Sequence, residues 1–329
     1  MKEIELKNNS ITLFRYIAAF QVVLGHAAAL LKITFPEWIT QLLGLFQGVP
    51  LFFGLSGFLI WQSLERNDSF KTYVKKRIVR IYPQLWMGVM LSMLTIMIFY
   101  KEKINWLMLL LFIFTQSTFL QFWTPEFLRN YGSGTPNGSL WTICIFVQFY
   151  LAAYFLHKIL KNKQPAVWLL TIGGFLLSDI MYPAWGGVIK NEILYKLCGQ
   201  TLLPYLYLFL TGSFLSCFYR QMIPVLKKTW WIFLAGDMFF TMSGYDLPGR
   251  YSPFRTICLI LAVIGIAYRI NIKINYDISY EIYIFHGIIL NLLLELGLYG
   301  NMLYFFITIA ACILLSAGAY ELKKRLVRG

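Results

Sequence analysis

The sequence predicts an all-α integral membrane protein, a bundle of about ten transmembrane helices. Of its 329 residues, 58% are hydrophobic and only 13% are charged, against roughly 25% charged in an ordinary soluble domain. Apolar runs close to the ~20 residues that one helical crossing needs recur from Ile11 to the C-terminus, with short polar joints between them. We therefore expect residues 1–329 to form a single transmembrane domain without a separate soluble one.

Ten stretches of the chain are predicted to enter the bilayer. The first is kept as a membrane helix and not a signal peptide, because no small-residue cleavage site followed by a soluble region comes after it. The third is long enough for two crossings, split near Tyr100. In chain order the predicted spans are 11–31, 41–63, 82–123, 139–157, 166–182, 201–219, 229–243, 253–268, 278–296 and 301–322.

The basic residues decide between one and two crossings in 82–123. The joint 64–81 carries six lysines and arginines, so it should lie in the cytoplasm with the N-terminus, and the basic C-terminal tail should lie there too. Both conditions hold only if 82–123 makes an odd number of crossings. We therefore expect one full crossing plus an interfacial or re-entrant piece within 82–123, and an outer location for the joint 124–138.

The net charge of +14 points to the membrane surface. Because the basic residues cluster in a few joints, they suit membrane lipids with anionic headgroups, and nucleic acid is a poor alternative partner. The five cysteines are odd in number and sit singly within or beside apolar runs. Soft-metal sites need clustered thiolates or imidazoles, so we expect no metal site and no disulfide.

Ionisable side chains inside the spans are the first candidates for a functional site, because their burial in a membrane is costly. Arg15 and His26 are eleven residues apart in the first span, which places them on nearly one helical face with His26 about 16 Å deeper. Arg77 and Arg80 are one turn apart and offer two guanidinium forks to a phosphorylated ligand from the cytoplasm. Pro83 after them is expected near a helix start. Snorkelling and positive-inside anchoring are the structural alternatives.

Three further segments combine small and polar residues. Glycines around Ser56 permit close helix approach. Asn137 and Trp141 form a polar turn with an interfacial tryptophan on the outer side. Glu281 and His286 lie in one span about 140° apart on a helical wheel, so they would not face one point without a helix break.

Together these pieces resemble the membrane acyltransferase family 3, whose members O-acylate carbohydrates, notably bacterial surface polysaccharides. The compact chain, without an appended hydrolase-like domain, looks most like the phage and bacterial O-antigen O-acetyltransferases. The segments that carry the resemblance are RYIAAFQVVLGH (15–26), GVPLFFGLSGFLI (48–60), RIVRIYP (77–83), NGSLWT followed by QFYL (137–151) and ISYEIYIFH (278–286).

The resemblance implies acyl transfer from cytoplasmic acyl-CoA, usually acetyl-CoA, which acts as a substrate and not as a permanently bound cofactor. His26 would be the catalytic residue, either deprotonating a sugar hydroxyl or carrying the acyl group itself. Arg15, Arg77 and Arg80 match the functional arginines of the family. The implied location is the bacterial inner membrane, with both termini in the cytoplasm.

The acceptor implied by the resemblance is a carbohydrate or lipid-linked polysaccharide, such as lipopolysaccharide O-antigen. It would approach from the outer side past Asn137 and Trp141. The chain departs from the family where many members carry a glutamate and this sequence has Phe146 and Val147. Our hypothesis is that Glu281 supplies the missing carboxylate. Candidate supporting residues in the same segments are Ser56, Tyr150, Glu281 and His286.

Two other classes of protein fit the same residues. A membrane transporter would use the buried arginines and histidines to bind an anionic or lipid-linked saccharide or to relay protons. The lack of a strong internal repeat counts mildly against that class. A non-catalytic scaffold would tolerate both Arg15→Ala and His26→Ala.

Overall fold

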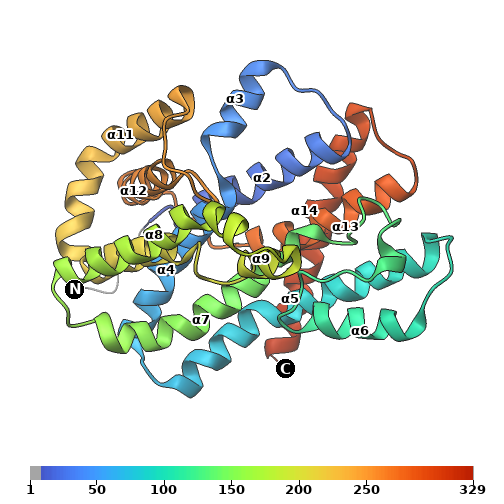
Figure 1. Cartoon of the computed structure of the whole chain (residues 1–329), viewed down its shortest axis with the longest axis horizontal. Helices are drawn as coiled ribbons and strands as arrows, with labels where there is room; N and C mark the ends of the chain where they lie inside the picture. The colour runs from blue at the N-terminus through green and yellow to red at the C-terminus, as the bar shows by residue number, and fades with distance from the viewer. Residues whose placement is uncertain (1–8, 329) are drawn as a thin grey trace. The chain divides into compact units, whose positions relative to one another are not determined.

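The computed structural model describes residues 9–328, with side chains up to residue 325, and contains no strand in that range (Figure 1). The all-α fold class is therefore confirmed. The α-helices are α2 (Ile11–Leu30), α3 (Glu37–Leu45), α4 (Gly48–Arg66), α5 (Phe70–Phe99), α6 (Trp106–Ser117), α7 (Trp141–Leu160), α8 (Pro165–Val188), α9 (Glu192–Cys198), α10 (Leu206–Cys217), α11 (Tyr219–Ser243), α12 (Pro253–Ile270), α13 (Ser279–Glu295) and α14 (Met302–Arg328). Two short 3-10 helices are η1 (Glu126–Leu128) and η2 (Gly138–Leu140).

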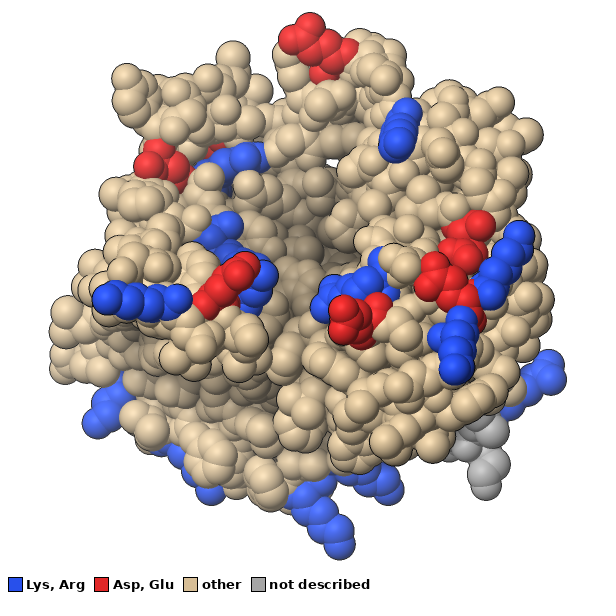
Figure 2. Space-filling view, turned by 45° about the vertical axis from the view of Figure 1, so that its right-hand side comes forward, with Lys and Arg blue, Asp and Glu red and all other residues tan. Residues whose placement is uncertain are grey.

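Seven helical segments of the described chain are long and apolar enough to cross a bilayer. Large apolar side chains on them, such as Leu170 and Met90, are exposed, and most of the face shown in Figure 2 is uncharged. A surface of this kind suits lipid. The protein is a multi-pass membrane protein. The seven segments are Ile11–Leu30, Glu37–Arg66, Phe70–Phe99, Gly138–Leu160, Pro165–Val188, Pro253–Ile270 and Met302–Arg325. Of the remaining predicted spans, 278–296 matches α13, 201–219 contains the shorter α10, and 229–243 covers only the second part of α11, which begins at Tyr219.

The long stretch 82–123 contains one crossing helix and one short helix. α5 has 30 residues, whereas α6 has 12, about 18 Å of helix against a hydrocarbon core of about 30 Å. The indole of Trp86 on α5 donates to the carbonyl of Ser117 at the end of α6. The Tyr100 hydroxyl, just beyond α5, donates to the carbonyl of Phe127. The chain therefore runs back along α5 and then returns to the end of α5 near Tyr100, an arrangement that fits the predicted interfacial or re-entrant piece.

The structure corrects the expected boundary before this crossing. The joint 64–81 is mostly helical, because only residues 67–69 separate α4 from α5. Pro83 therefore lies inside α5 and not near its start. Buried Tyr73 and Ile81 hold one face of the first turns of α5, while the basic side chains occupy the other positions. Hydropathy alone reads such an amphipathic stretch as a polar joint.

The chain divides into two compact units that interleave along the sequence. The first unit contains residues up to Ala18, Gly44–Val74 and Ile145–Tyr276. The second unit contains Ala19–Leu43, Lys75–Cys144 and the chain from Asp277 onward. The organisation as one transmembrane domain stays a prediction.

Glycines close the packing of α4 against α10 in the first unit. A Cβ atom on Gly57 would lie 1.9 Å from the carbonyl oxygen of Phe209, and one on Gly212 would lie 1.8 Å from that of Gly54. The two backbones therefore touch, which a side chain at either glycine would prevent. The glycine-rich segment around Ser56 has a packing role.

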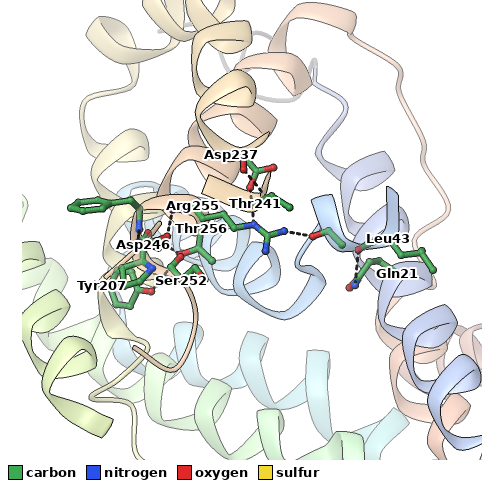
Figure 3. A network of polar contacts seen from close by, with 12 residues as sticks. Gln21, Leu43, Tyr207, Asp237, Thr241, Asp246, Ser252, Arg255 and Thr256 are labelled. Carbon is green, nitrogen blue, oxygen red and sulfur yellow. Dashed lines mark hydrogen bonds and ion pairs between the residues drawn. The ribbon is translucent and has the colours of Figure 1, made fainter. Parts of the chain in front are cut away.

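An arginine-centred network lies where α11 leads into α12 in the same unit (Figure 3). The Arg255 side chain lies 3.3 Å from a carboxylate oxygen of buried Asp237 and also donates to the carbonyl of Gly44. Asp246 accepts the backbone N–H groups of Phe254 and Arg255 at the start of α12. Charge pairing and capping thus fix this turn.

Candidate functional site

Two histidines from distant parts of the sequence meet in the second unit. His26 lies near the end of α2 and His286 in the middle of α13, and their Nδ1 and Nε2 atoms are 2.9 Å apart. His286 is completely buried, whereas His26 is exposed. The imidazole of His26 is therefore accessible, and the buried imidazole of His286 holds it through this contact.

The surroundings of His286 favour one arrangement of protons. In a contact between two neutral imidazoles, one nitrogen donates and the other accepts. His286 Nδ1 is buried and lies next to the backbone carbonyls of Ile282 and Tyr283. The backbone groups one turn back on a helix are carbonyls, which only accept, so a proton is favoured on Nδ1. His286 Nε2 then accepts from His26 Nδ1, which leaves the Nε2 lone pair of His26 available.

The predicted acceptor-side residue Asn137 lies beside the histidine pair and is buried. Its Nδ2 donates to the carbonyl of Ile284 at 2.9 Å, and its Oδ1 accepts from the Ser139 hydroxyl at 2.6 Å. A Cβ atom on Gly287, the residue after His286, would lie 2.3 Å from Asn137 Oδ1. Asn137 therefore fixes the loop before α7 against α13 at the level of His286.

A second set of hydrogen bonds continues this contact. Tyr283, one turn before His286, donates from its hydroxyl to the carbonyl of Ser139 at 3.0 Å. The Thr142 hydroxyl lies 2.9 Å from the same phenol oxygen. All three side chains are buried, so this network is fully desolvated and fixes one geometry.

Glu281 does not reach the histidine pair. It lies on the continuous helix α13, as the predicted 140° offset from His286 requires. Its carboxylate instead accepts a hydrogen bond of 2.7 Å from Gln84 on α5. In this structure the polar partner of His26 is therefore His286.

Two of the predicted arginines lie near the start of α13. Arg80 is 3.3 Å from the carboxylate of Asp277, and its side chain remains 38% exposed. Asp277 also accepts the backbone N–H and hydroxyl of Ser279, which caps the start of α13. Arg77 lies one turn before Arg80 on α5 and is half-buried. The geometry of Arg80 thus depends on the capping carboxylate.

Other predicted residues are not gathered around His26 within the second unit. Arg15, Ser56 and Tyr150 belong to the first unit. Trp141 starts α7 in the second unit and is half-buried. Phe146, where many relatives have a glutamate, packs edge-on against Phe53 at 5.1 Å between ring centroids. That position therefore belongs to an aromatic cluster in the first unit.

No group of three His, Cys, Asp or Glu residues in the described chain could hold a metal ion.

The sequence profile described as "Acyltransferase domain" matches residues 8–321, nearly the entire chain. The chain belongs to this acyltransferase family. The resemblance found in the sequence is thereby confirmed, and the protein is an enzyme that transfers acyl groups. The histidine pair and its supporting loop are accordingly the candidate active site of the acyltransferase.

Curated relatives of the acyltransferase are similar at low identity over most of its length. "Nodulation protein 10" of Rhizobium leguminosarum bv. viciae is 26% identical over 89% of this chain and 86% of its own. The "O-acetyl transferase" of Shigella phage Sf6 is 24% identical over 92% of each chain. A "Putative acetyltransferase ORF330" of Acidianus two-tailed virus is 28% identical over 46% of this chain and 39% of its own. No solved structure matches.

Sequence reasoning missed several residues of the candidate active site. Ser139 and Thr142 lie within the NGSLWT segment, and Tyr283 lies three residues before His286. That spacing places Tyr283 and His286 on one face of the acyltransferase's α13, which was the available signal. Gln84 gave no signal, because its partner Glu281 is 197 residues away.

Proposed function

We propose that this acyltransferase moves an acetyl group from acetyl-CoA, bound from the cytoplasm, to a hydroxyl of a surface polysaccharide or its lipid-linked precursor, such as lipopolysaccharide O-antigen. The site of action is the bacterial inner membrane, with both termini in the cytoplasm. The similarity to the phage protein named "O-acetyl transferase" supports O-acetyl transfer. The observation that carries the proposal is the contact of exposed His26 with buried His286.

The chemistry follows from the nitrogen that the pair leaves unprotonated. His26 Nε2 removes the proton of a sugar hydroxyl as its oxygen attacks the thioester carbonyl. The carbon–sulfur bond then breaks, and the leaving thiolate of CoA takes the proton back from His26. While His26 is protonated, the hydrogen bond of its Nδ1 to His286 holds the ring and stabilises the charge. The same nitrogen could attack the thioester first and carry the acyl group.

The donor is held at the cytoplasmic end of the second unit. The guanidinium forks of Arg77 and Arg80 bind phosphate oxygens of CoA, and the pantetheine arm extends toward His26. The ion pair of Arg80 with Asp277 supports this role, since it fixes the direction of the guanidinium and leaves part of it exposed. The family assignment favours this enzyme over a transporter.

The test is replacement of His26 by alanine. We expect His26→Ala to abolish acetylation of the host glycan, because the group that moves the proton is gone. The measurement is the acetate released from surface glycan by mild alkali, compared between cells with the wild-type and variant genes. His157→Gln is the matched control, since His157 bonds Glu65 in the first unit. Normal acetylation by a normally expressed His26→Ala protein would refute the proposal.

A further inference from the structure

A second polar site lies in the second unit, away from the histidine pair. A cavity of about 1000 Å³ opens between the start of α6 and the segment that contains η1. Its lining includes Asn105, Trp123, Glu126, Phe127 and Arg129. The catalytic steps proposed above use none of them.

The lining offers the groups that recognise a sugar. The lining combines the amide of Asn105 and the charged groups of Glu126 and Arg129 with the aromatic rings of Trp123 and Phe127. Sugar hydroxyls both donate and accept hydrogen bonds, as do hydroxyls in general, and their ring carbons present apolar C–H faces to aromatic side chains. A pocket of aromatic walls with a few convergent polar groups suits such a ligand.

The charges in the cavity disfavour a phosphorylated ligand. Glu126 and Arg129 lie three residues apart and balance each other, so the lining carries no net charge. Both are exposed, and neither side chain is held by another group in the described part of the chain. Phosphate sites gather several cationic forks, and this cavity has one. A neutral, polyhydroxylated ligand therefore fits better than CoA.

A buried hydrophobic cluster holds the aromatic walls of the cavity in place. Ile96, Tyr100, Phe112, Leu128 and Tyr131 form a buried cluster, and Trp123 and Phe127 pack on it. The Tyr100 hydroxyl donates to the carbonyl of Phe127. Burial, together with Glu102, raises the pKa of Tyr100 to about 12, so the phenol keeps its proton at physiological pH. Rigid walls reduce the conformational entropy that the protein loses when a ligand binds.

The loop beyond the cavity runs along α13 toward the histidines. Gly132 donates to Glu295 at 3.0 Å, and Ser133 donates to Asn291 at 2.7 Å. Farther along, Asn137 bonds Ile284 beside His286. Glu295 and His286 are nine residues apart, which is on the order of 14 Å along the helix. A ligand in the cavity is therefore offset from the reacting nitrogen.

We propose that this cavity binds a sugar residue of the acceptor remote from the hydroxyl that is acylated, so that the enzyme selects a saccharide chain over a single sugar. The inference rests on the proposed function, since it concerns the acceptor of that reaction. Remote binding of this kind orients the reacting hydroxyl and discriminates among acceptors.

The experiment compares a polymeric with a minimal acceptor. The enzyme in lipid nanodiscs receives radiolabelled acetyl-CoA and either the host's own surface polysaccharide, deacetylated by mild alkali, or methyl glycosides of its component sugars. The test variant is the double substitution Glu126→Gln with Arg129→Gln, which removes both charges and keeps a polar side chain at each position. Lys103→Gln is the matched control, because Lys103 is exposed nearby and does not line the cavity.

We expect the double variant to raise the KM for the polysaccharide about tenfold, the effect of losing hydrogen bonds to charged groups. Its kcat, its KM for acetyl-CoA and its activity on methyl glycosides should stay at wild-type values, as should every parameter of Lys103→Gln. An unchanged KM for the polysaccharide, or an equal loss with both acceptors, would overturn the inference.

Direct binding separates this inference from the proposed function. Calorimetric titration of the deacetylated polysaccharide into the His26→Ala variant should give wild-type affinity, and adding the double substitution should weaken it about tenfold. If the wild-type protein transfers no acetate but binds in this pattern, the proposed function fails and the cavity assignment stands. If the wild-type protein transfers acetate and the cavity substitutions leave its affinity for the polysaccharide unchanged, the proposed function stands and the cavity assignment fails.

Discussion

At the scale of single residues, His286 is the partner of His26 that no local spacing in the sequence indicates. In the sequence it ends a tyrosine-rich segment, and Glu281 looked like the more natural partner of a catalytic histidine. In the structure Glu281 accepts a hydrogen bond from Gln84, and His286 is the hydrogen-bond partner of His26. Under the proposed mechanism His286 is a positioning residue, because it would act on the reaction through His26.

Substitution of His286 tests that role. Positioning partners of this kind typically contribute 10–100-fold, so we expect His286→Ala to lower kcat by about that factor and leave the KM for acetyl-CoA unchanged. His286→Gln should recover most of the rate, because its amide oxygen accepts the same hydrogen bond from His26. The measurement is steady-state kinetics of acetyl transfer at matched protein levels. Equal inactivity of both variants at wild-type thermal stability would contradict the positioning role.

At the scale of elements, α13 makes different polar contacts at its start, its middle and its end. Its start is capped by Asp277, its middle holds His286, and its end receives the cavity loop through Asn291 and Glu295. Every side chain from Glu281 to Asn291 on α13 is buried. A long buried helix of this kind transmits a fixed spacing between sites.

The glycine contact of α4 with α10 is testable in the first unit. We expect Gly57→Ala to destabilise the protein by more than the ~1–3 kcal/mol typical of overpacking, because the new methyl group would meet the backbone of Phe209 and not a flexible side chain. Thermal unfolding in detergent measures the effect. Gly174→Ala on α8 is the control, since its Cβ meets no atom within 4 Å. Equal midpoints for the two variants would contradict the packing role.

At the scale of the whole molecule, the proposed mechanism takes its donor from the cytoplasm and its acceptor from the outer side of the membrane, so the side on which each loop lies tests it. The short α6 predicts that the cavity segment lies outside. We expect Arg129→Cys to react with an impermeant thiol reagent in spheroplasts, as Lys103→Cys should under either topology. Lys163→Cys should react only after permeabilisation. The unsubstituted protein is the control for labelling of the native cysteines. Protection of Arg129→Cys until permeabilisation would mean that α6 crosses the membrane.

The sequence by itself determined the all-α membrane class, the positions of the predicted spans and the resemblance that the family assignment confirmed. These follow from hydropathy and local spacing, which act within some twenty residues. It misplaced the start of α5, because hydropathy misreads an amphipathic helix end as a joint.

Only the tertiary structure decided which partner each polar side chain has. His26 and His286 are 260 residues apart, and no local pattern pairs them. The same holds for Asn137 with Ile284, and for the cavity between the start of α6 and the segment that contains η1. In a low-dielectric interior a polar group must find whichever partner the packed helices bring within about 3 Å. Helix packing sets that distance, and the order of residues along the chain does not.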